Sequence, residues 1–287
     1  MKTDFPNITI LGAGLLGGSL ALALAALENP PNVRLWARKP ETATAAVKLG
    51  ISQATANLAE AVKDANLVVL AVPVGAMAAL VKDALDAGLP DGCLITDVGS
   101  VKKVVHRYVS PLLKGRDIQF IGSHPMAGSE RNGLAAITAD LFQNAACLLT
   151  KDNAAPAAQA AELERFWKTI GCRTSWMSAA IHDELVARIS HLPHLIAASA
   201  ARVCLKDPSE GKFGGGGLRD TTRVAAGNPT MWAEIAIENR EALSGLLRES
   251  IDDLREILAS LEHADQEQVH QWLVTAKQRR DPLNSYL

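Results

Sequence analysis

The sequence predicts a parallel α/β domain followed by an all-α domain, and two observations carry that prediction. Apolar strands alternate with helices over the first part of the chain, whereas from about residue 176 the strands stop and long amphipathic helices follow. Alternating apolar strands and helices build a parallel sheet that helices cover on both faces. With 287 residues, the chain is long enough for two domains. We expect them at 1–175 and 176–287.

The chain opens with a strand, a glycine-rich turn and a helix. The apolar strand covers residues 8–11, the pattern G-x-G-x-x-G covers 12–17, and an alanine- and leucine-rich helix follows. The glycines allow a tight turn and a close backbone approach, and the helix N-terminus then faces a pyrophosphate. This order predicts a Rossmann-like dinucleotide-binding domain, with a glycine-rich turn that binds no ligand as the alternative. The residues expected to contact the cofactor are Gly12, Gly14, Leu15, Leu16 and Gly17.

Further strands and helices alternate along the first domain. Ligands of such sheets bind beyond the carboxyl ends of the strands. The residues of interest are therefore Val72 and Pro73, the segment 97–100, and His124. We expect strands at 33–37, 67–73, 94–98 and from 119, and helices at 41–49, 58–63, 76–87, 101–113 and from within 153–161.

Two basic residues follow the second strand. NAD sites usually place an acidic residue there to bind the ribose 2′-hydroxyl, whereas this chain has Arg38 and Lys39. A basic pair suits a 2′-phosphate. We therefore favour NADP over NAD, and a solvated basic turn that leaves NAD as the cofactor is the alternative.

Composition argues against several classes of partner. The 29 Lys and Arg residues nearly balance 31 Asp and Glu residues, which argues against a nucleic-acid partner. An uncharged apolar run of 18 residues is absent from the sequence, so we expect no membrane partner. The chain does not begin like a signal peptide, and it has no C-x-x-C pair. We expect reduced, mostly buried thiols in a cytoplasmic protein, at Cys93, Cys147, Cys172 and Cys204.

In the second domain, the sequence predicts helices at 178–205, 228–261 and 264–280, with a glycine-rich loop at 210–227 between the first two. Apolar residues at helical spacing need a partner surface, and a homodimer would supply one. We therefore expect a helical dimerisation domain. The stripe consists of Ile235, Leu243, Leu246, Leu247, Ile251, Leu254 and Leu258.

Polar residues follow two strands of the first domain. Ser100 stands at the N-cap position of the expected helix, where capping alone would explain it, although a hydroxyl at a strand end can also face a ligand. His124 is an extended residue before Pro125, in a loop that also carries Glu130. A solvated loop histidine is the alternative for His124.

The first helix of the second domain carries His191 and His194 on one face, with Pro193 between them. A proline inside a helix costs about 3 kcal/mol. A kinked core helix with two satisfied histidines and half of a metal site are both alternatives to a ligand pocket.

The glycine-rich loop ends in a charged cluster. Arg219, Asp220 and Arg223 follow four glycines. Arginine binds carboxylates in bidentate geometry, and the flexible backbone lets it turn into a cleft. A surface cluster without a ligand is the alternative.

Taken together, these segments resemble the prephenate dehydrogenase family of tyrosine biosynthesis, which includes arogenate and cyclohexadienyl dehydrogenases. The motifs GAGLLGGSLA, DVGSVK, GSHPMAGSE, SHLPH, GGGGLRDTTRVA and NPTMW occur in the family's order. The resemblance implies a Rossmann-like domain followed by a helical dimerisation domain. It also implies oxidative decarboxylation of a cyclohexadienol, with hydride transfer to NAD or NADP. We expect no fused mutase or regulatory domain, because the chain ends at Leu287.

The resemblance also assigns roles to residues of this sequence. His124 would accept the proton of the 4-hydroxyl group, and Ser100 would orient the reacting groups. Arg223 would bind the substrate carboxylate. The remaining expected pocket residues are His191, His194, Asp220, Glu130 and Trp232, the last with a possible position across the dimer.

The sequence leaves two substrates and two other protein classes as alternatives. We favour prephenate over arogenate, because His194 and Trp232 resemble residues of prephenate-using members. A β-hydroxyacid or imine dehydrogenase would carry a lysine or aspartate where this chain has histidines. An NADP-sensing dimeric regulatory protein would need no proton acceptor at His124.

Overall fold

The computed structural model describes residues 3–128, 133–152 and 155–285. The chain forms two compact units, Met1–Asn239 and Arg240–Leu287. The larger unit holds the sheets together with the helices that follow them up to Asn239. The domain boundary expected between residues 175 and 176 therefore stays a prediction.

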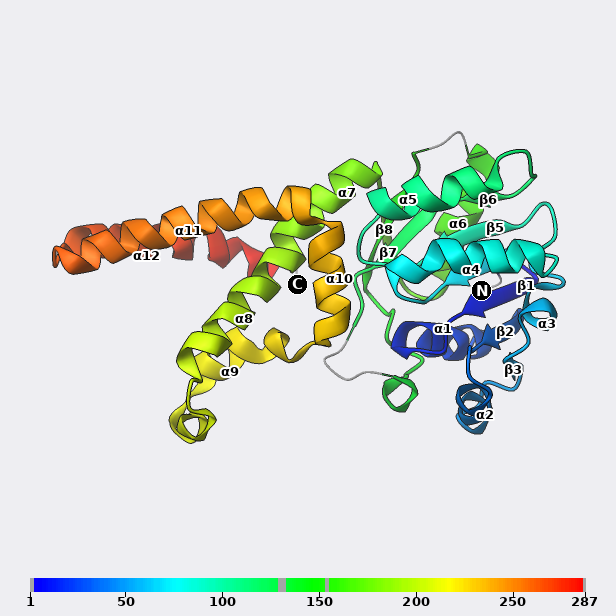
Figure 1. The fold of residues 1–287 in the computed structure, drawn as a ribbon, viewed down its shortest axis with the longest axis horizontal. Helices are drawn as coiled ribbons and strands as arrows, with labels where there is room; N and C mark the ends of the chain where they lie inside the picture. The colour runs from blue at the N-terminus through cyan, green and yellow to red at the C-terminus, as the bar shows by residue number, and fades with distance from the viewer. Residues whose placement is uncertain (1–2, 129–132, 153–154, 286–287) are drawn as a thin grey trace. The chain divides into compact units, whose positions relative to one another are not determined.

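The larger unit contains a six-stranded parallel sheet with the order β3-β2-β1-β4-β5-β6 (Figure 1). This is the strand order of dinucleotide-binding domains, whose ligands lie where the order reverses, between β1 and β4. The sequence pattern does not predict the two-residue edge strand β3. The strands are β1 (Asn7–Leu11), β2 (Asn32–Trp36), β3 (Ala54–Thr55), β4 (Leu67–Leu70), β5 (Leu94–Asp97) and β6 (Gln119–Phe120).

Helices cover both faces of this sheet (Figure 1). Leu67 and Val69 of β4 belong to the core on the side of α1 and α6, whereas Val68 and Leu70 belong to the core on the side of α4 and α5. The strand is apolar throughout because both of its faces are buried. The helices are α1 (Leu15–Ala25), α2 (Pro40–Lys48), α3 (Leu58–Val62), α4 (Val74–Asp86), α5 (Lys103–Val109) and α6 (Ala157–Thr169).

A second sheet of three strands continues from the first. It consists of β7 (Gly122–Pro125), β8 (Ala146–Thr150) and β9 (Arg173–Met177), with β7 antiparallel and β9 parallel to β8. The single strand expected from residue 119 is therefore wrong, because the chain changes sheets at Ile121. His124 lies in β7 opposite Leu148 rather than in a loop.

The helix expected over 178–205 is interrupted by a π-helical turn, Ala187–His191. Pro193 lies in the first turn of the helix that follows. A missing N–H is tolerated there, because the first N–H groups of a helix have no partner within it. The segments are α7 (Ala179–Val186), the π turn and α8 (Leu192–Cys204).

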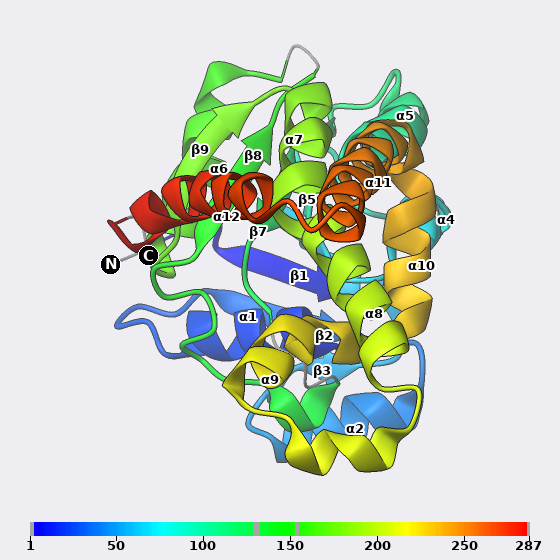
Figure 2. The ribbon, with the colours of Figure 1, turned by 90° about the vertical axis from the view of Figure 1, so that its left-hand side faces the viewer.

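Two shorter helices complete the larger unit, and α9 lies against α8 (Figure 2). They are α9 (Gly216–Thr222) and α10 (Pro229–Glu238). Short 3₁₀ turns occur at Ser110–Leu113, Leu134–Ala136, Pro208–Phe213 and Arg223–Ala226.

The smaller unit is a pair of helices, α11 (Arg240–Glu262) and α12 (Gln266–Arg280), followed by a 3₁₀ turn at Asp281–Ser285. The single helix expected over 228–261 is wrong, because Asn239 separates α10 from α11. Within the hairpin, Trp272 Nε1 donates to Asp253 Oδ1 at 3.1 Å.

Two further expectations concern the membrane and the cysteines. Across the described parts of the chain, every helix is too short or too polar to cross a bilayer. Cys93, Cys147 and Cys172 are buried free thiols, and Cys204 is an exposed one.

Candidate active site

The glycine-rich turn has the geometry of a dinucleotide cradle. Gly12 has a φ of +127°, and a Cβ on Gly12 would collide with the backbone of Ala71, while one on Gly17 would collide with the Gly12 carbonyl oxygen. A Cβ on Gly14 would have none of the described atoms within 4 Å, and Gly14 is the N-cap residue of α1. The turn is thus closed against the protein and open at the helix N-terminus, which fits a bound pyrophosphate.

The other residues expected at the cofactor lie around this turn. Leu15 begins α1, and Leu16 packs against the core of the first sheet. Both are half-buried. Arg38 and Lys39 are exposed between the end of β2 and the start of α2. They follow the end of the second strand, beside which the cofactor ribose is expected.

The end of β4 approaches the same turn. Val72 Cγ1 lies 3.0 Å from a Cβ built on Gly12, and Pro73 is exposed immediately before α4. The Gly75 amide in the first turn of α4 donates to Glu234 Oε1 of α10. This bond ties the helix that carries Trp232 to the cofactor end of the sheet.

A line of three side chains runs from β7 to α7. His124 Nδ1 lies 2.9 Å from His182 Nε2, and His182 Nδ1 lies 2.8 Å from Asp183 Oδ1. The same carboxylate accepts the amides of Lys102 at 2.8 Å and Lys103 at 3.0 Å. Asp183 therefore closes the first turn of α5 from a different helix.

This contact explains why the N-cap position expected for Ser100 is wrong. Helix α5 begins at Lys103, and Lys102 rather than Ser100 occupies its N-cap position. Because Asp183 satisfies the amides at this end, the helix does not need the serine hydroxyl. Ser100 lies in a half-buried bend, with its backbone beside the His191 ring.

A buried ion pair supports the strand that carries His124. Lys102 Nζ contacts Asp97 Oδ2, and both side chains are fully buried. The same aspartate accepts the amides of Ser123 at 3.1 Å and Gly99 at 2.9 Å. Asp97 thus joins the carboxyl end of β5 to β7.

The histidines near this line are held in the neutral form. Burial lowers the pKa of His124 well below the ordinary value of 6.5, and neighbouring His182 and Lys102 lower it further. Burial also lowers the pKa of His182, and it lowers the pKa of His191 to about 4. Neutral imidazoles can accept a proton, so the site supports base chemistry at neutral pH.

The rings of His191 and His194 both lie beside Trp232. Asn239 Nδ2 donates to His191 Nδ1 at 3.0 Å and to the Asp183 carbonyl oxygen at 2.8 Å. His194 stacks on Trp232 of the same chain, with ring centroids 3.5 Å apart. Among the described residues, His191 Nε2 and His194 Nδ1 find no hydrogen-bond partner. We name His124, His182, His191 and His194 the histidine cluster.

The continuous loop expected over 210–227 is wrong, because residues 216–222 form α9, and the charged residues of this segment lie at the surface. Arg223 is exposed at the first position of its 3₁₀ turn, and exposed Asp220 pairs with Arg219 at 3.3 Å. Glu130 lies outside the described residues. The expected roles of Arg223 and Asp220 at the substrate stay predictions.

Four residues of this site escape the sequence-based prediction, namely Lys102, His182, Asp183 and Asn239. A weak signal exists for two of them. His182 and Asp183 are adjacent polar residues of α7, and the structure buries both side chains. Buried polar groups require partners. Which partners they take depends on β7, which lies 58 residues away from His182 in sequence.

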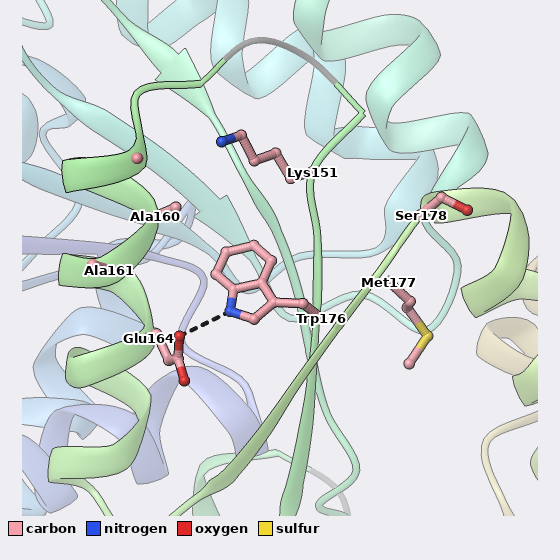
Figure 3. Close-up of a pocket in the computed structure, with 8 residues that line it drawn as sticks. Lys151, Ala160, Ala161, Glu164, Trp176, Met177 and Ser178 are labelled. Carbon is pink, nitrogen blue, oxygen red and sulfur yellow. Dashed lines mark hydrogen bonds between the residues drawn. The ribbon is translucent and has the colours of Figure 1, made fainter.

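A surface pocket lies elsewhere, between α6 and β9 (Figure 3). Its lining includes Lys151, Glu164 and Trp176, and Trp176 Nε1 donates to Glu164 Oε2 at 2.9 Å. The predicted site residues are not part of its lining. In the described parts of the chain, no group of three or more metal-ligating side chains is placed to hold a metal ion.

Comparison with known proteins agrees with this arrangement. The model of the prephenate dehydrogenase nucleotide-binding domain matches residues 20–176, and that of the prephenate dehydrogenase dimerisation domain matches 178–275. The chain is 35% identical to prephenate dehydrogenase of Bacillus subtilis, over 96% of this chain and 76% of that protein. It is 36% identical to cyclohexadienyl dehydrogenase of Zymomonas mobilis, over 92% of this chain and 91% of that protein.

A solved structure shows the same fold over nearly the whole chain. Prephenate dehydrogenase from A. aeolicus, in complex with hydroxyphenyl propionate and NAD+, aligns with a TM-score of 0.88 and 28% sequence identity. The alignment covers 99% of this chain and all of that one. The chain belongs to the prephenate dehydrogenase family, whose members are NAD(P)-dependent oxidoreductases.

Proposed function

We propose that this enzyme converts prephenate to 4-hydroxyphenylpyruvate by oxidative decarboxylation, with His124 as the general base. The observation that carries the proposal is the setting of His124. It is a buried, neutral imidazole in β7, directly beyond the carboxyl end of the parallel sheet, where ligands of this fold bind. A neutral imidazole there can take a proton from a substrate hydroxyl.

The proposed reaction balances in protons and electrons. The bound dinucleotide supplies the hydride acceptor. His124 accepts the proton of the C4 hydroxyl group as hydride leaves C4. The bond from the ring to its carboxylate then breaks, and the electron pair enters the ring as CO₂ departs. His124 returns its proton to the oxygen at C4, so that a phenol forms without net proton uptake.

Other residues of the predicted site would bind and orient the substrate. We assign the ring carboxylate to Arg223, with Asp220 holding its loop. His191 Nε2 and His194 Nδ1 are buried polar atoms that find no partner among the described residues, and a substrate oxygen would supply one. Trp232 would form a flat wall for the ring, and Ser100 would orient the reacting groups. Glu130 would complete the pocket.

Prephenate is the favoured substrate, and arogenate is a second candidate. Both carry the same ring, hydroxyl and carboxylate, and they differ in the keto or amino group of the side chain. Similarity to the B. subtilis prephenate dehydrogenase supports the first. Similarity to the Z. mobilis cyclohexadienyl dehydrogenase supports use of both.

NADP is the favoured cofactor over NAD. The argument rests on Arg38 and Lys39, which are exposed at the end of β2, where a 2′-phosphate would lie. The A. aeolicus structure contains NAD+, so NAD is the competing outcome. The ratio of kcat/KM for the two cofactors decides between them.

We also propose a homodimer in the cytoplasm. Helix α11 exposes an apolar stripe in which Ile251, Leu254 and Leu258 are 42%, 54% and 53% exposed. A stripe of this kind needs a partner surface. The match to a dimerisation domain supports a second copy of the chain as that partner. The four free thiols suit a reducing compartment.

The test is a steady-state assay of prephenate and arogenate, each with NAD and with NADP, on the wild type and on His124→Asn. We expect the variant to bind cofactor normally and to lose at least about 100-fold in kcat. The matched control is His270→Asn, because His270 is exposed in the smaller unit and should be replaceable without loss. Full turnover by His124→Asn would refute the assignment of the base.

A further inference from the structure

The hydrogen bonds that join His124, His182 and Asp183 each have a defined donor and acceptor. The inner end of this line is Asp183, whose carboxylate accepts the amides of Lys102 and Lys103. These bonds, and the one from His182, hold the pKa of Asp183 below its ordinary value despite burial. A carboxylate that accepts two amides is ionised, so it can only accept from its third partner.

The acceptor role of Asp183 fixes which nitrogen of His182 carries the hydrogen. Because Asp183 Oδ1 accepts, the ring nitrogen 2.8 Å from it, His182 Nδ1, carries a hydrogen. His182 is fully buried, and burial lowers its pKa. A neutral ring with a hydrogen on Nδ1 has a bare Nε2. That bare nitrogen faces His124 at 2.9 Å and can only accept.

We propose that Asp183 and His182 are positioning residues that fix the tautomer of the base, so that His124 carries its hydrogen on Nδ1 and presents a bare Nε2. The proposal rests on the proposed function of His124. It goes further by naming the two residues that leave Nε2 of His124 without a hydrogen, so that this nitrogen can act as the base. Which ring nitrogen of a histidine holds the hydrogen is set by the bond that the other nitrogen makes.

The consequence for catalysis is large, because the two tautomers are not equivalent. With its hydrogen on Nε2, His124 would present a donor to the substrate hydroxyl and could not take its proton. In the serine protease triad, a carboxylate likewise sets the tautomer of the catalytic histidine. Loss of its charge leaves the geometry intact but yields the wrong tautomer. The arrangement here differs in that a second imidazole stands between carboxylate and base.

The competing arrangement is a protonated His182 that donates at both ends. It would reverse the tautomer of His124. The charged neighbour Lys102 opposes it, because its cation lowers the pKa of both His124 and His182. The ionised Asp183 favours it. A direct measurement of proton positions separates the two arrangements.

The first experiment reads the tautomers by NMR in the resting full-length enzyme, labelled with ¹⁵N in the histidine rings. Long-range proton–nitrogen correlations distinguish a hydrogen on Nδ1 from one on Nε2. The His124 and His182 signals are assigned by their loss in His124→Asn and His182→Gln. We expect both rings to be neutral with the hydrogen on Nδ1. A hydrogen on Nε2 of His124, or a doubly protonated His182, would overturn the proposal.

The second experiment compares variants by kcat and KM. Asp183→Asn removes the negative charge that favours a hydrogen on His182 Nδ1, and it places an amide donor against one of the two main-chain amides that Asp183 accepts. We therefore expect at least a tenfold fall in kcat with a substrate KM within about twofold. His182→Gln keeps an oxygen that can accept from His124, whereas His182→Leu does not. We therefore expect the glutamine variant to retain more kcat than the leucine variant. A purely packing role would give the reverse order and would contradict the proposal.

The matched control is His106→Gln. His106 is also a buried histidine with a side-chain hydrogen bond, 2.9 Å from Nε2 to Thr150 Oγ1, but it is not part of the line. We expect it to keep kcat and the His124 tautomer. If Asp183→Asn does not fold, the wild-type spectrum still decides the proposal. Absence of turnover by the wild type on both substrates would refute the proposed function, and the proton positions would remain readable.

Discussion

Asp183 serves three parts of the larger unit with one side chain and one carbonyl group. Its carboxylate closes the first turn of α5 and orients His182, while its main-chain oxygen accepts from Asn239. Asn239 in turn holds His191. The proposed base and the proposed pocket histidine are therefore positioned from the same residue of α7.

The residues of this site differ in how readily the sequence predicts them. His124, His191 and His194 stand out because a polar residue interrupts an apolar strand or helix next to glycine or proline. His182 does not, because it lies in a helix that tolerates polar residues on its outer face. Its role follows only from a contact with a strand 58 residues away. Hydrogen bonds of that kind have no periodic pattern along the chain.

At the same scale, we predict that Arg223→Ala raises the KM for the substrate and leaves the KM for the cofactor nearly unchanged. A charge-assisted hydrogen bond to a carboxylate contributes about 1.5–3 kcal/mol, which corresponds to roughly 10- to 150-fold in KM. Steady-state kinetics with each reactant varied in turn will measure both constants. Arg219→Ala is the control, because Arg219 is an exposed residue of α9, four positions before Arg223. Equal increases for substrate and cofactor would indicate a structural role for Arg223.

At the scale of elements, the π turn resolves the conflict between Pro193 and a buried helix. The turn at Ala187–His191 ends the helix before the proline, so that Pro193 falls in the first turn of α8. His191 and His194, on either side of it, are both buried. The sequence predicts a kink here. It does not predict a π turn, because a proline marks a break without selecting its geometry.

The break between α10 and α11 is a second such element, and it gives a stability prediction. Asn239→Ala removes two hydrogen bonds from a buried side chain and leaves His191 Nδ1 without its donor. We expect a loss of about 1–3 kcal/mol, which thermal unfolding at constant protein concentration will show as a lower midpoint.

Asn228→Ala is the matched control for this prediction, because Asn228 flanks the other end of α10 but is exposed. It caps the helix through Met231 N at 3.1 Å, and such a cap contributes about 1 kcal/mol. Equal effects of the two substitutions would mean that the buried bonds of Asn239 add nothing to the stability of the fold.

At the scale of the whole molecule, the first sheet is predictable and the second is not. The continuous apolar run at 67–70 and the glycine turn predict buried parallel strands and their place in a dinucleotide-binding domain. Strands β7 and β8 form a short antiparallel pair, and β7 follows β6 after a single residue. Sequence periodicity marks an extended segment there, but not the residue at which it changes sheets.

The buried histidines make the stability of the protein depend on pH. The pKa of His191 is about 4 in the folded chain and about 6.5 in an unfolded one. Between these values the unfolded chain binds a proton that the folded chain does not, so stability falls as pH falls from 6.5 towards 4. The slope is about 1.4 kcal/mol per pH unit for this residue alone. Above pH 6.5 its contribution is constant.

Thermal unfolding from pH 7.5 to 5 tests this dependence. We expect the midpoint to fall below pH 6.5, and to fall less steeply in His191→Gln. His263→Gln, which replaces an exposed histidine of the smaller unit, should leave the slope unchanged. Identical slopes for the wild type and His191→Gln would show that this histidine is protonated to the same extent in both states.

The last prediction concerns assembly. If α11 meets a second copy through its apolar stripe, a charge in that stripe must be desolvated in the dimer but not in the monomer. We expect Leu254→Glu combined with Leu258→Glu to give a monomer of about half the wild-type mass in light scattering, because both side chains are more than half exposed in the single chain. Glu256→Lys changes an exposed charge on the other side of α11 and should leave the mass unchanged. A double variant that stays dimeric would place the interface on another surface, and the stripe of α11 would then need a different partner.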